Sequence, residues 1–153
     1  MRLWHYKLIP FLPDKQLRGQ WSELNDIFSN QKNHILINYV YEYPKDDLFI
    51  YSAMIVEEMH KRGYAIKFSE NFNNYFGLDM YKRPCDYTPF KRHHNNRYLQ
   101  QCFYNLQEKF DRCQKDFSEE QFKQLEKFVI KELFKTWANH TPNKDIKTED
   151  KNE

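Results

Sequence analysis

Apolar residues recur at helical spacing in several separate stretches of the chain. The first stretch predicts a helix over about residues 14–30, with Asp14 as its N-cap after Pro13. The second predicts a helix that opens with the acidic residues 46–47, ends at Gly63 and is apolar on most sides. We therefore expect the second helix to form the centre of the core.

Two further helices are predicted in the C-terminal half. Thr88 and Pro89 are an N-cap and first-turn pair, which indicates that a third helix begins there. Ser118 and Gln121 have the spacing of a capping box and precede a fourth, amphipathic helix. Residues 141–153 are polar and alternately charged, which predicts a disordered tail.

The segments between these helices have no clear period. Residues 3–12 contain two prolines, which oppose a regular helix, and we expect an extended N-terminal arm that packs across the domain. The run 35–41 is rich in β-forming residues, but a single strand has no evident partner, so helix or extended coil remain alternatives. Residues 64–88 are rich in turn-forming residues and are predicted to be a long loop.

Length and composition limit the class of protein. The chain has 153 residues, of which 40% are hydrophobic and 18% aromatic, enough for the core of one domain. No apolar run approaches the roughly 18 residues of a membrane span, and no signal-peptide pattern is present. We therefore expect one compact all-α domain of about four helices over residues 1–140, with 118–140 as an additional C-terminal helix, in the cytoplasm.

The net charge of +2 is small, but the cations are unevenly distributed. One group lies at the start of the chain, and the most basic stretch lies where the third helix is predicted to begin. A helix N-terminus surrounded by cations would bind phosphate, whereas the alternative is a solvated basic face. The residues of this stretch are Lys91, Arg92, His93, His94 and Arg97.

Cysteine and histidine spacing predicts neither disulfides nor a metal site. Cys85, Cys102 and Cys113 are odd in number and widely spaced, so we expect reduced thiols, with Cys102 and Cys113 in the core. The adjacent histidines 93–94 cannot both point at one metal from a helix. We expect no metal and no organic cofactor.

The first residues of the chain contain a dense motif. MRLWH is followed by LIP-x-LP, by QL-x-GQ and then by Glu23. This combination resembles the pyrimidine dimer DNA glycosylase family of the endonuclease V type, and in particular its bacterial relatives that open with MRLWH. The similarity continues through His34, the helix end at residues 57–64 and the segment 87–89, about two-thirds of the chain.

The resemblance implies a helical DNA repair enzyme with glycosylase and strand-nicking lyase activities. The N-terminal amine, here that of Met1, would form an imine with the sugar of the damaged nucleotide, and Glu23 would stabilise the sugar cation and move protons. An α-amine is less basic than a lysine amine, so more of it is unprotonated near neutral pH. Damaged double-stranded DNA would contact Arg2, Gln16, Arg18, His34, Lys91, Arg92, His93, His94 and Arg97.

The sequence departs from the family pattern near the expected catalytic carboxylate. Ser22 and Asp26 occupy positions where the family commonly has arginines, and Gln16 replaces a histidine of the family's phage enzyme. These departures leave open a non-catalytic helical protein that binds DNA, or a protein partner through helix 118–140. A third hypothesis keeps the imine chemistry but acts on another lesion, such as an abasic site.

Overall fold

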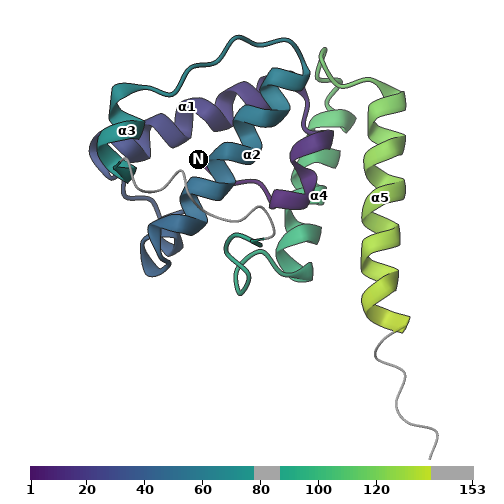
Figure 1. Ribbon diagram of the computed structural model, residues 1–153. Coiled ribbons are helices and arrows are strands. Elements are labelled where there is room, and N and C mark those ends of the chain that lie inside the picture. Colours follow the sequence, from purple (N-terminus) through teal and green to yellow (C-terminus); the bar gives the residue numbers. More distant parts are fainter. Residues whose placement is uncertain (78–86, 139–153) are drawn as a thin grey trace, which may run out of the picture.

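A computed structural model describes residues 1–77 and 87–138, the side chains of residues 136–138 excepted. Within these ranges the chain is all-α, as predicted, and contains no strand (Figure 1). It has five α-helices where about four were expected, and two short 3₁₀ helices. In chain order, the elements are η1 Tyr6–Phe11, α1 Asp14–Asn30, η2 Asn38–Glu42, α2 Lys45–Lys61, α3 Glu70–Phe76, α4 Asn96–Asp111 and α5 Glu119–Ala138.

Three of the predicted helices are confirmed with nearly the expected limits. Helix α1 covers the predicted range, although Pro13 rather than Asp14 is its N-cap. The chain leaves α2 through Gly63, whose φ of 86° is readily adopted by glycine. Before α5, Ser118 N–H donates to Gln121 Oε1 at 2.9 Å, and the N–H of Gln121 donates to Ser118 Oγ at 3.2 Å. This is the predicted capping box.

The predicted start of the third helix is wrong. Helix α4 begins at Asn96, because Asn95 caps it with a side chain that accepts the N–H of Tyr98. The segment from Pro89 to His93 forms a turn, in which Asp47 Oδ1 accepts the N–H of Phe90 at 2.6 Å. Most of the basic stretch 91–97 therefore lies in this turn and the cap, and not in a first helical turn.

The N-terminal arm is not fully extended, because it contains η1. Pro10 fits this short helix although it has no N–H group. The hydrogen bonds that close η1 are donated by Leu8 N–H to the His5 carbonyl at 2.8 Å and by Leu12 N–H to the Ile9 carbonyl at 3.3 Å. The run 35–41, for which strand, helix and coil were open, forms a turn followed by η2.

The loop predicted over residues 64–88 contains helix α3, which sequence inspection missed. Ser69 caps this helix, and Phe72 and Phe76 are buried against Phe28 of α1. Burial of aromatic rings thus overrides the turn-forming composition of the segment. Residues 78–86 of that loop, with Cys85, and the predicted tail 141–153 lie outside the described residues.

The other two cysteines were both expected in the core. Cys102 is buried in α4, as predicted, whereas Cys113 is exposed. Cys113 lies two residues beyond the end of α4, with a φ of 57°, in a turn at the surface. The helical period that buries Cys102 therefore does not extend to Cys113.

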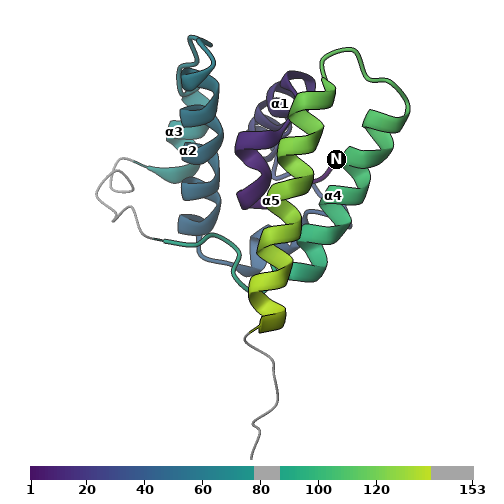
Figure 2. The ribbon, with the colours of Figure 1, turned by 90° about the vertical axis from the view of Figure 1, so that its right-hand side faces the viewer.

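The helices form two groups that η1 connects. Helix α1 packs against α2 and α3, and α4 packs against α5 (Figures 1 and 2). Helix η1 contacts both α2 and α5, and Lys7 Nζ reaches Glu132 Oε2 of α5 at 2.6 Å. The residues before η1 are therefore fixed from both sides, and the N-terminus lies beside α4 in Figure 2.

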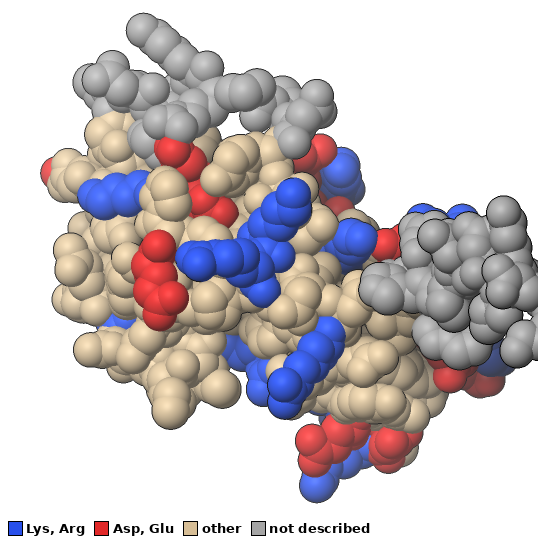
Figure 3. Space-filling model, turned by 90° about the horizontal axis from the view of Figure 1, so that it is seen from below, with Lys and Arg blue, Asp and Glu red and all other residues tan. Residues whose placement is uncertain are grey.

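Two surface properties bear on function. No helix in the described ranges is long and apolar enough to cross a membrane. The loop before α4 lies on the lower side of the molecule in Figure 1. On that side, Lys and Arg side chains gather near the middle of the face, with acidic side chains beside them (Figure 3). Cationic and acidic side chains therefore share this face of the molecule.

Candidate active site

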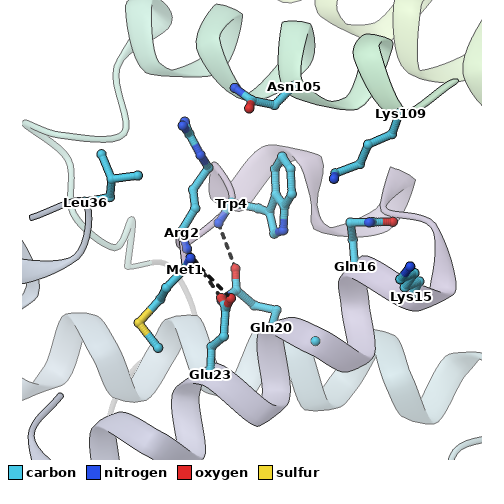
Figure 4. A pocket seen from close by; sticks show the side chains of 11 residues that line it. Met1, Arg2, Trp4, Lys15, Gln16, Gln20, Glu23, Leu36, Asn105 and Lys109 are labelled. Atoms are coloured by element: carbon cyan, nitrogen blue, oxygen red, sulfur yellow. Dashed lines mark hydrogen bonds and ion pairs between the residues drawn. The ribbon is translucent and has the colours of Figure 1, made fainter. Parts of the chain in front are cut away.

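A pocket of about 370 Å³ lies between the N-terminus, α1 and α4 (Figure 4). It is lined by three cationic side chains and one carboxylate. Arg2 comes from the arm, Lys15 and Glu23 from α1, and Lys109 from α4. An anionic ligand would meet an excess of positive charge there.

The amine and the carboxylate predicted to be catalytic lie together in this pocket. Met1 N is 3.9 Å from Glu23 Oε1, and Arg2 N–H donates to Glu23 Oε2 at 3.4 Å. The Met1 side chain is only 6% exposed, whereas that of Glu23 is 31% exposed. The terminus is thus anchored through its side chain while the carboxylate remains open to a ligand. A small shift or one bridging water would bring amine and carboxylate into hydrogen-bonding contact.

Buried Gln20 positions both groups. Its Oε1 accepts the N–H of Trp4 at 2.8 Å and lies 2.9 Å from the Tyr51 hydroxyl, while its Nε2 donates to Glu23 Oε2 at 3.2 Å. The Tyr51 hydroxyl also lies 2.8 Å from the Trp4 carbonyl oxygen, and burial raises the pKa of Tyr51 well above its usual value. Three segments, the arm, α1 and α2, therefore meet at one amide.

Replacing Gln20 by methionine is expected to lower the free energy of unfolding by about 2 kcal/mol. The buried Trp4 N–H would lose its acceptor, and an unsatisfied buried donor costs roughly 1–3 kcal/mol. Urea denaturation measures the change. Gln124→Met is the matched control, because Gln124 is exposed on α5. Equal stabilities of the two variants would contradict this role for Gln20.

Two buried histidines hold the arm against the rest of the molecule. His5 Nδ1 accepts the N–H of Lys7 at 3.2 Å, so its Nε2 carries the proton and donates to the His94 carbonyl at 2.8 Å. His94 Nδ1 accepts the N–H of Tyr6 at 3.2 Å, and its Nε2 donates to the Tyr39 hydroxyl at 2.8 Å. Burial lowers the pKa of His5 to about 4 and that of His94 well below its usual value. Both rings are therefore neutral at pH 7.

The part of the chain that builds most of this arrangement is similar to a known family. Residues 1–71 match the pyrimidine dimer DNA glycosylase family. The match ends within α3, and so covers less than the two-thirds expected from the motifs. It contains the arm, α1 with Glu23, and α2. No curated protein and no solved structure gave a match.

The matched family is described as pyrimidine dimer DNA glycosylases, and the match covers somewhat less than half of the 153 residues. Most of the pocket lies within the matched residues, including Met1, Arg2 and Glu23. Asn105 and Lys109 lie outside them, on α4. The matched segment therefore supplies the amine and the carboxylate, and the unmatched part of the chain closes one side of the pocket.

The residues predicted to contact DNA fall into separate places. Arg2 and Gln16 line the pocket, and Gln16 exchanges two hydrogen bonds with Gln114, at 3.0 and 2.6 Å. Arg18 is exposed on α1 outside the pocket lining. His34 is also outside the lining, but its Nδ1 accepts the N–H of Leu36, which does line the pocket.

The basic stretch before α4 is not part of the pocket lining. Lys91, Arg92 and Arg97 are exposed, and the Arg92 guanidinium lies 5.3 Å from the centre of the Tyr43 ring. The two histidines between them face inward. His94 belongs to the core, and the partly buried His93 stacks on Tyr39 and lies 2.8 Å from the Tyr43 hydroxyl. Their contacts favour a structural role, and direct DNA contact by these five residues stays a prediction.

Sequence inspection did not single out Lys109, Asn105 and Lys15 as site residues. Asn105 and Lys109 are four residues apart on α4, which places them on the same side of that helix. This spacing is the only signal that the sequence offered. It could not show that this side of α4 faces Glu23, because that depends on tertiary packing.

Proposed function

We propose that this protein is a DNA repair glycosylase with an associated strand-nicking lyase activity, and that its N-terminal amine is the nucleophile. The observation that carries the proposal is the 3.9 Å separation between Met1 N and Glu23 Oε1 in a cation-lined pocket. The glycosylase family match over residues 1–71 supports it independently. The family match implies damaged DNA as the substrate class, and we propose that the protein acts on a duplex.

In the first step, the unprotonated Met1 amine attacks C1′ of the damaged nucleotide. An N–C1′ bond forms, and the C1′–base bond breaks with its electron pair leaving on the base. The sugar ring opens to give the imine: one amine proton passes to O4′, which becomes a hydroxyl, and the other is lost and neutralises the departing base. Glu23 is close enough to the amine to accept that proton and to stabilise the positive charge that develops on the sugar.

In the second step, the imine acidifies the neighbouring C2′ position of the sugar. Removal of a C2′ proton expels the 3′ phosphate, which breaks the strand by β-elimination. Water then hydrolyses the imine and returns the free amine of Met1. Covalent catalysis of this kind splits one difficult bond cleavage into easier steps. Glu23 is the only carboxylate among the described residues that line the pocket, and we assign the proton transfers to it.

The phosphates on either side of the damaged nucleotide require cations. In Figure 4, Arg2 lies next to Met1, and Lys15 and Lys109 lie on the other side of Trp4 in the same pocket. Salt-dependent contacts of this type supply much of the affinity for DNA without reading its sequence. We assign these three side chains to the phosphates nearest the lesion, and Lys91, Arg92 and Arg97 to more distant ones.

Borohydride trapping tests the proposal directly. Borohydride reduces the imine, so purified protein of verified mass should become covalently attached to a duplex that carries a pyrimidine dimer or an abasic site. We expect the adduct to map to Met1 and to disappear when the N-terminus is acetylated. The duplex that gives the faster reaction identifies the lesion.

Lys15 and Lys109 are the competing amines in this experiment, because both line the same pocket. Lys15→Met and Lys109→Met should each still form the Met1 adduct. An adduct that maps to either lysine would contradict the assignment of the nucleophile. Absence of any adduct, with DNA binding retained, would instead favour the non-catalytic binding protein.

A further inference from the structure

A turn beside the pocket exposes two consecutive apolar side chains. Ile35 is 86% exposed, more than any other large hydrophobic side chain in the described ranges, and Leu36 is 44% exposed. Leu36 also lines the pocket that contains Met1 and Glu23. Because water disfavours such exposure, two adjacent apolar side chains at the edge of a polar pocket indicate a binding role.

The turn is held in place by hydrogen bonds and by one buried anchor. His34 N–H donates to Asn38 Oδ1 at 2.7 Å, and Leu36 N–H donates to His34 Nδ1 at 3.2 Å. Ile37 is fully buried, and its N–H donates to the His34 carbonyl at 2.8 Å. Ile35 and Leu36 therefore project from a fixed base, so little ordering entropy is lost when they bind.

We propose that Ile35 and Leu36 form a wedge that enters the base stack of duplex DNA beside the damaged nucleotide. The inference rests on the proposed function, because it uses the same pocket and substrate. An enzyme that acts on a nucleotide within a duplex must first take it out of the stack. Apolar side chains such as isoleucine and leucine, inserted between base pairs, unstack a step and kink the duplex.

The surroundings of the turn favour DNA over a protein partner. In Figure 4, Leu36 lies on the opposite side of the pocket from Lys109, with Arg2 between them. Phosphates on the Arg2 side of an opened base step would thus find cations while the apolar side chains meet the bases. Two apolar residues beside several cations are also a small area compared with the apolar centre of a stable protein interface.

The wedge can be tested by DNA binding alone, without the covalent reaction. A duplex with a tetrahydrofuran abasic analogue cannot form an imine, and 2-aminopurine placed next to the analogue becomes more fluorescent when it is unstacked. Wild-type protein should raise this fluorescence on binding. The double variant Ile35→Ser, Leu36→Ser should lose the rise. Ile130→Ser is the matched control, because Ile130 is 49% exposed on α5, which contributes no residue to the pocket lining.

A second measurement separates opening of the stack from the reaction itself. An abasic site in a single strand needs no duplex opening. We therefore expect borohydride trapping by the double variant to slow by about tenfold or more on the duplex, roughly the effect of losing one modest interaction in the transition state, and to slow much less on the single strand. Thermal melting checks that the exposed substitutions leave the fold intact.

The outcomes distinguish the wedge from the proposed function. If wild-type protein forms no adduct but still gives a fluorescence rise that the double variant loses, the wedge stands and the imine chemistry fails. If adducts form and the double variant equals wild type in both assays, the wedge is overturned and the chemistry stands. Equal slowing on duplex and single strand also overturns it, because the side chains would then act on the pocket.

Three remaining outcomes also decide the question. If neither a fluorescence rise nor an adduct is seen with wild-type protein, the wedge and the proposed function are both overturned. If the double variant changes only the molar mass measured by light scattering, Ile35 and Leu36 lie between copies of this chain, and the wedge is overturned. If Ile130→Ser also loses the fluorescence rise, removal of any exposed apolar side chain has this effect. That result overturns the specific role of the turn.

Discussion

Glu23→Gln is expected to reduce strand cleavage by roughly 10²–10⁴-fold, the usual contribution of a general acid or base. Glutamine keeps the shape of the side chain and can accept hydrogen bonds from Arg2 N–H and Gln20, but it cannot take a proton from the Met1 amine or stabilise a sugar cation by charge. Single-turnover cleavage of a lesion-containing duplex measures the loss. Borohydride trapping shows whether imine formation or the later elimination is slowed.

Binding separates a catalytic Glu23 from a structural one. The substitution removes the only negative charge from a pocket that is otherwise cationic among its described lining residues, so affinity for the duplex should be unchanged or higher. Glu57→Gln is the matched control, because Glu57 is exposed on α2 and pairs with Lys61 on the same helix. A parallel fall of affinity and cleavage in Glu23→Gln would contradict the assigned role and make the residue a structural support of the arm.

The helices that the sequence predicted correctly are those with local signals at their ends. Helix α1 follows Pro13 and has a clear apolar period. The chain leaves α2 through Gly63, and a glycine after a helix is itself a local stop signal. The predicted start of α4 was wrong because a long-range contact determines where this helix begins. Asp47 holds the N–H of Phe90, which keeps the Pro89 segment in a turn, and the cap passes to Asn95.

Only part of the candidate site could likewise be predicted from the sequence. The pairing of the Met1 amine with Glu23 was expected from the family resemblance, and the two groups do lie close together. Composition alone could not have supplied it, because every chain has an α-amine and most helices carry glutamates. Lys109 and Leu36 come from segments far apart in the sequence, and no local pattern shows that they share a pocket with Glu23.

Lowering the pH from about 6.5 to 5 is expected to remove about 2 kcal/mol of stability through His5 alone. Burial, partly offset by its hydrogen bond to the His94 carbonyl, lowers the pKa of His5 to about 4 in the folded protein, whereas the unfolded chain has the usual value near 6.5. Between these values the unfolded state binds the proton and the folded state does not. The free energy of unfolding is therefore not reduced by His5 above pH 6.5, and it falls as the pH is lowered towards 4.

His94 adds to this loss with the same sign. Burial, together with repulsion from His5 and His93, lowers its pKa well below the usual value. Glu132 acts in a separate window, because hydrogen bonds from Lys135 and Lys7 lower its pKa to about 2. Its contribution is present above the unfolded value near 4.5 and is lost only as the pH falls from there towards 2. The interval from pH 7 to 5 therefore reports mainly on the two buried histidines.

Urea denaturation at pH 7, 6 and 5 measures the effect, and His5→Gln tests its origin. The glutamine amide can still donate to the His94 carbonyl but binds no proton, so the variant should lose about 2 kcal/mol of the pH dependence. His60→Gln, on the exposed end of α2, should keep the wild-type slope. A wild-type slope in His5→Gln would contradict the argument. Because His5 lies four residues from Met1, acid that charges this ring also loosens the segment that holds the amine beside Glu23.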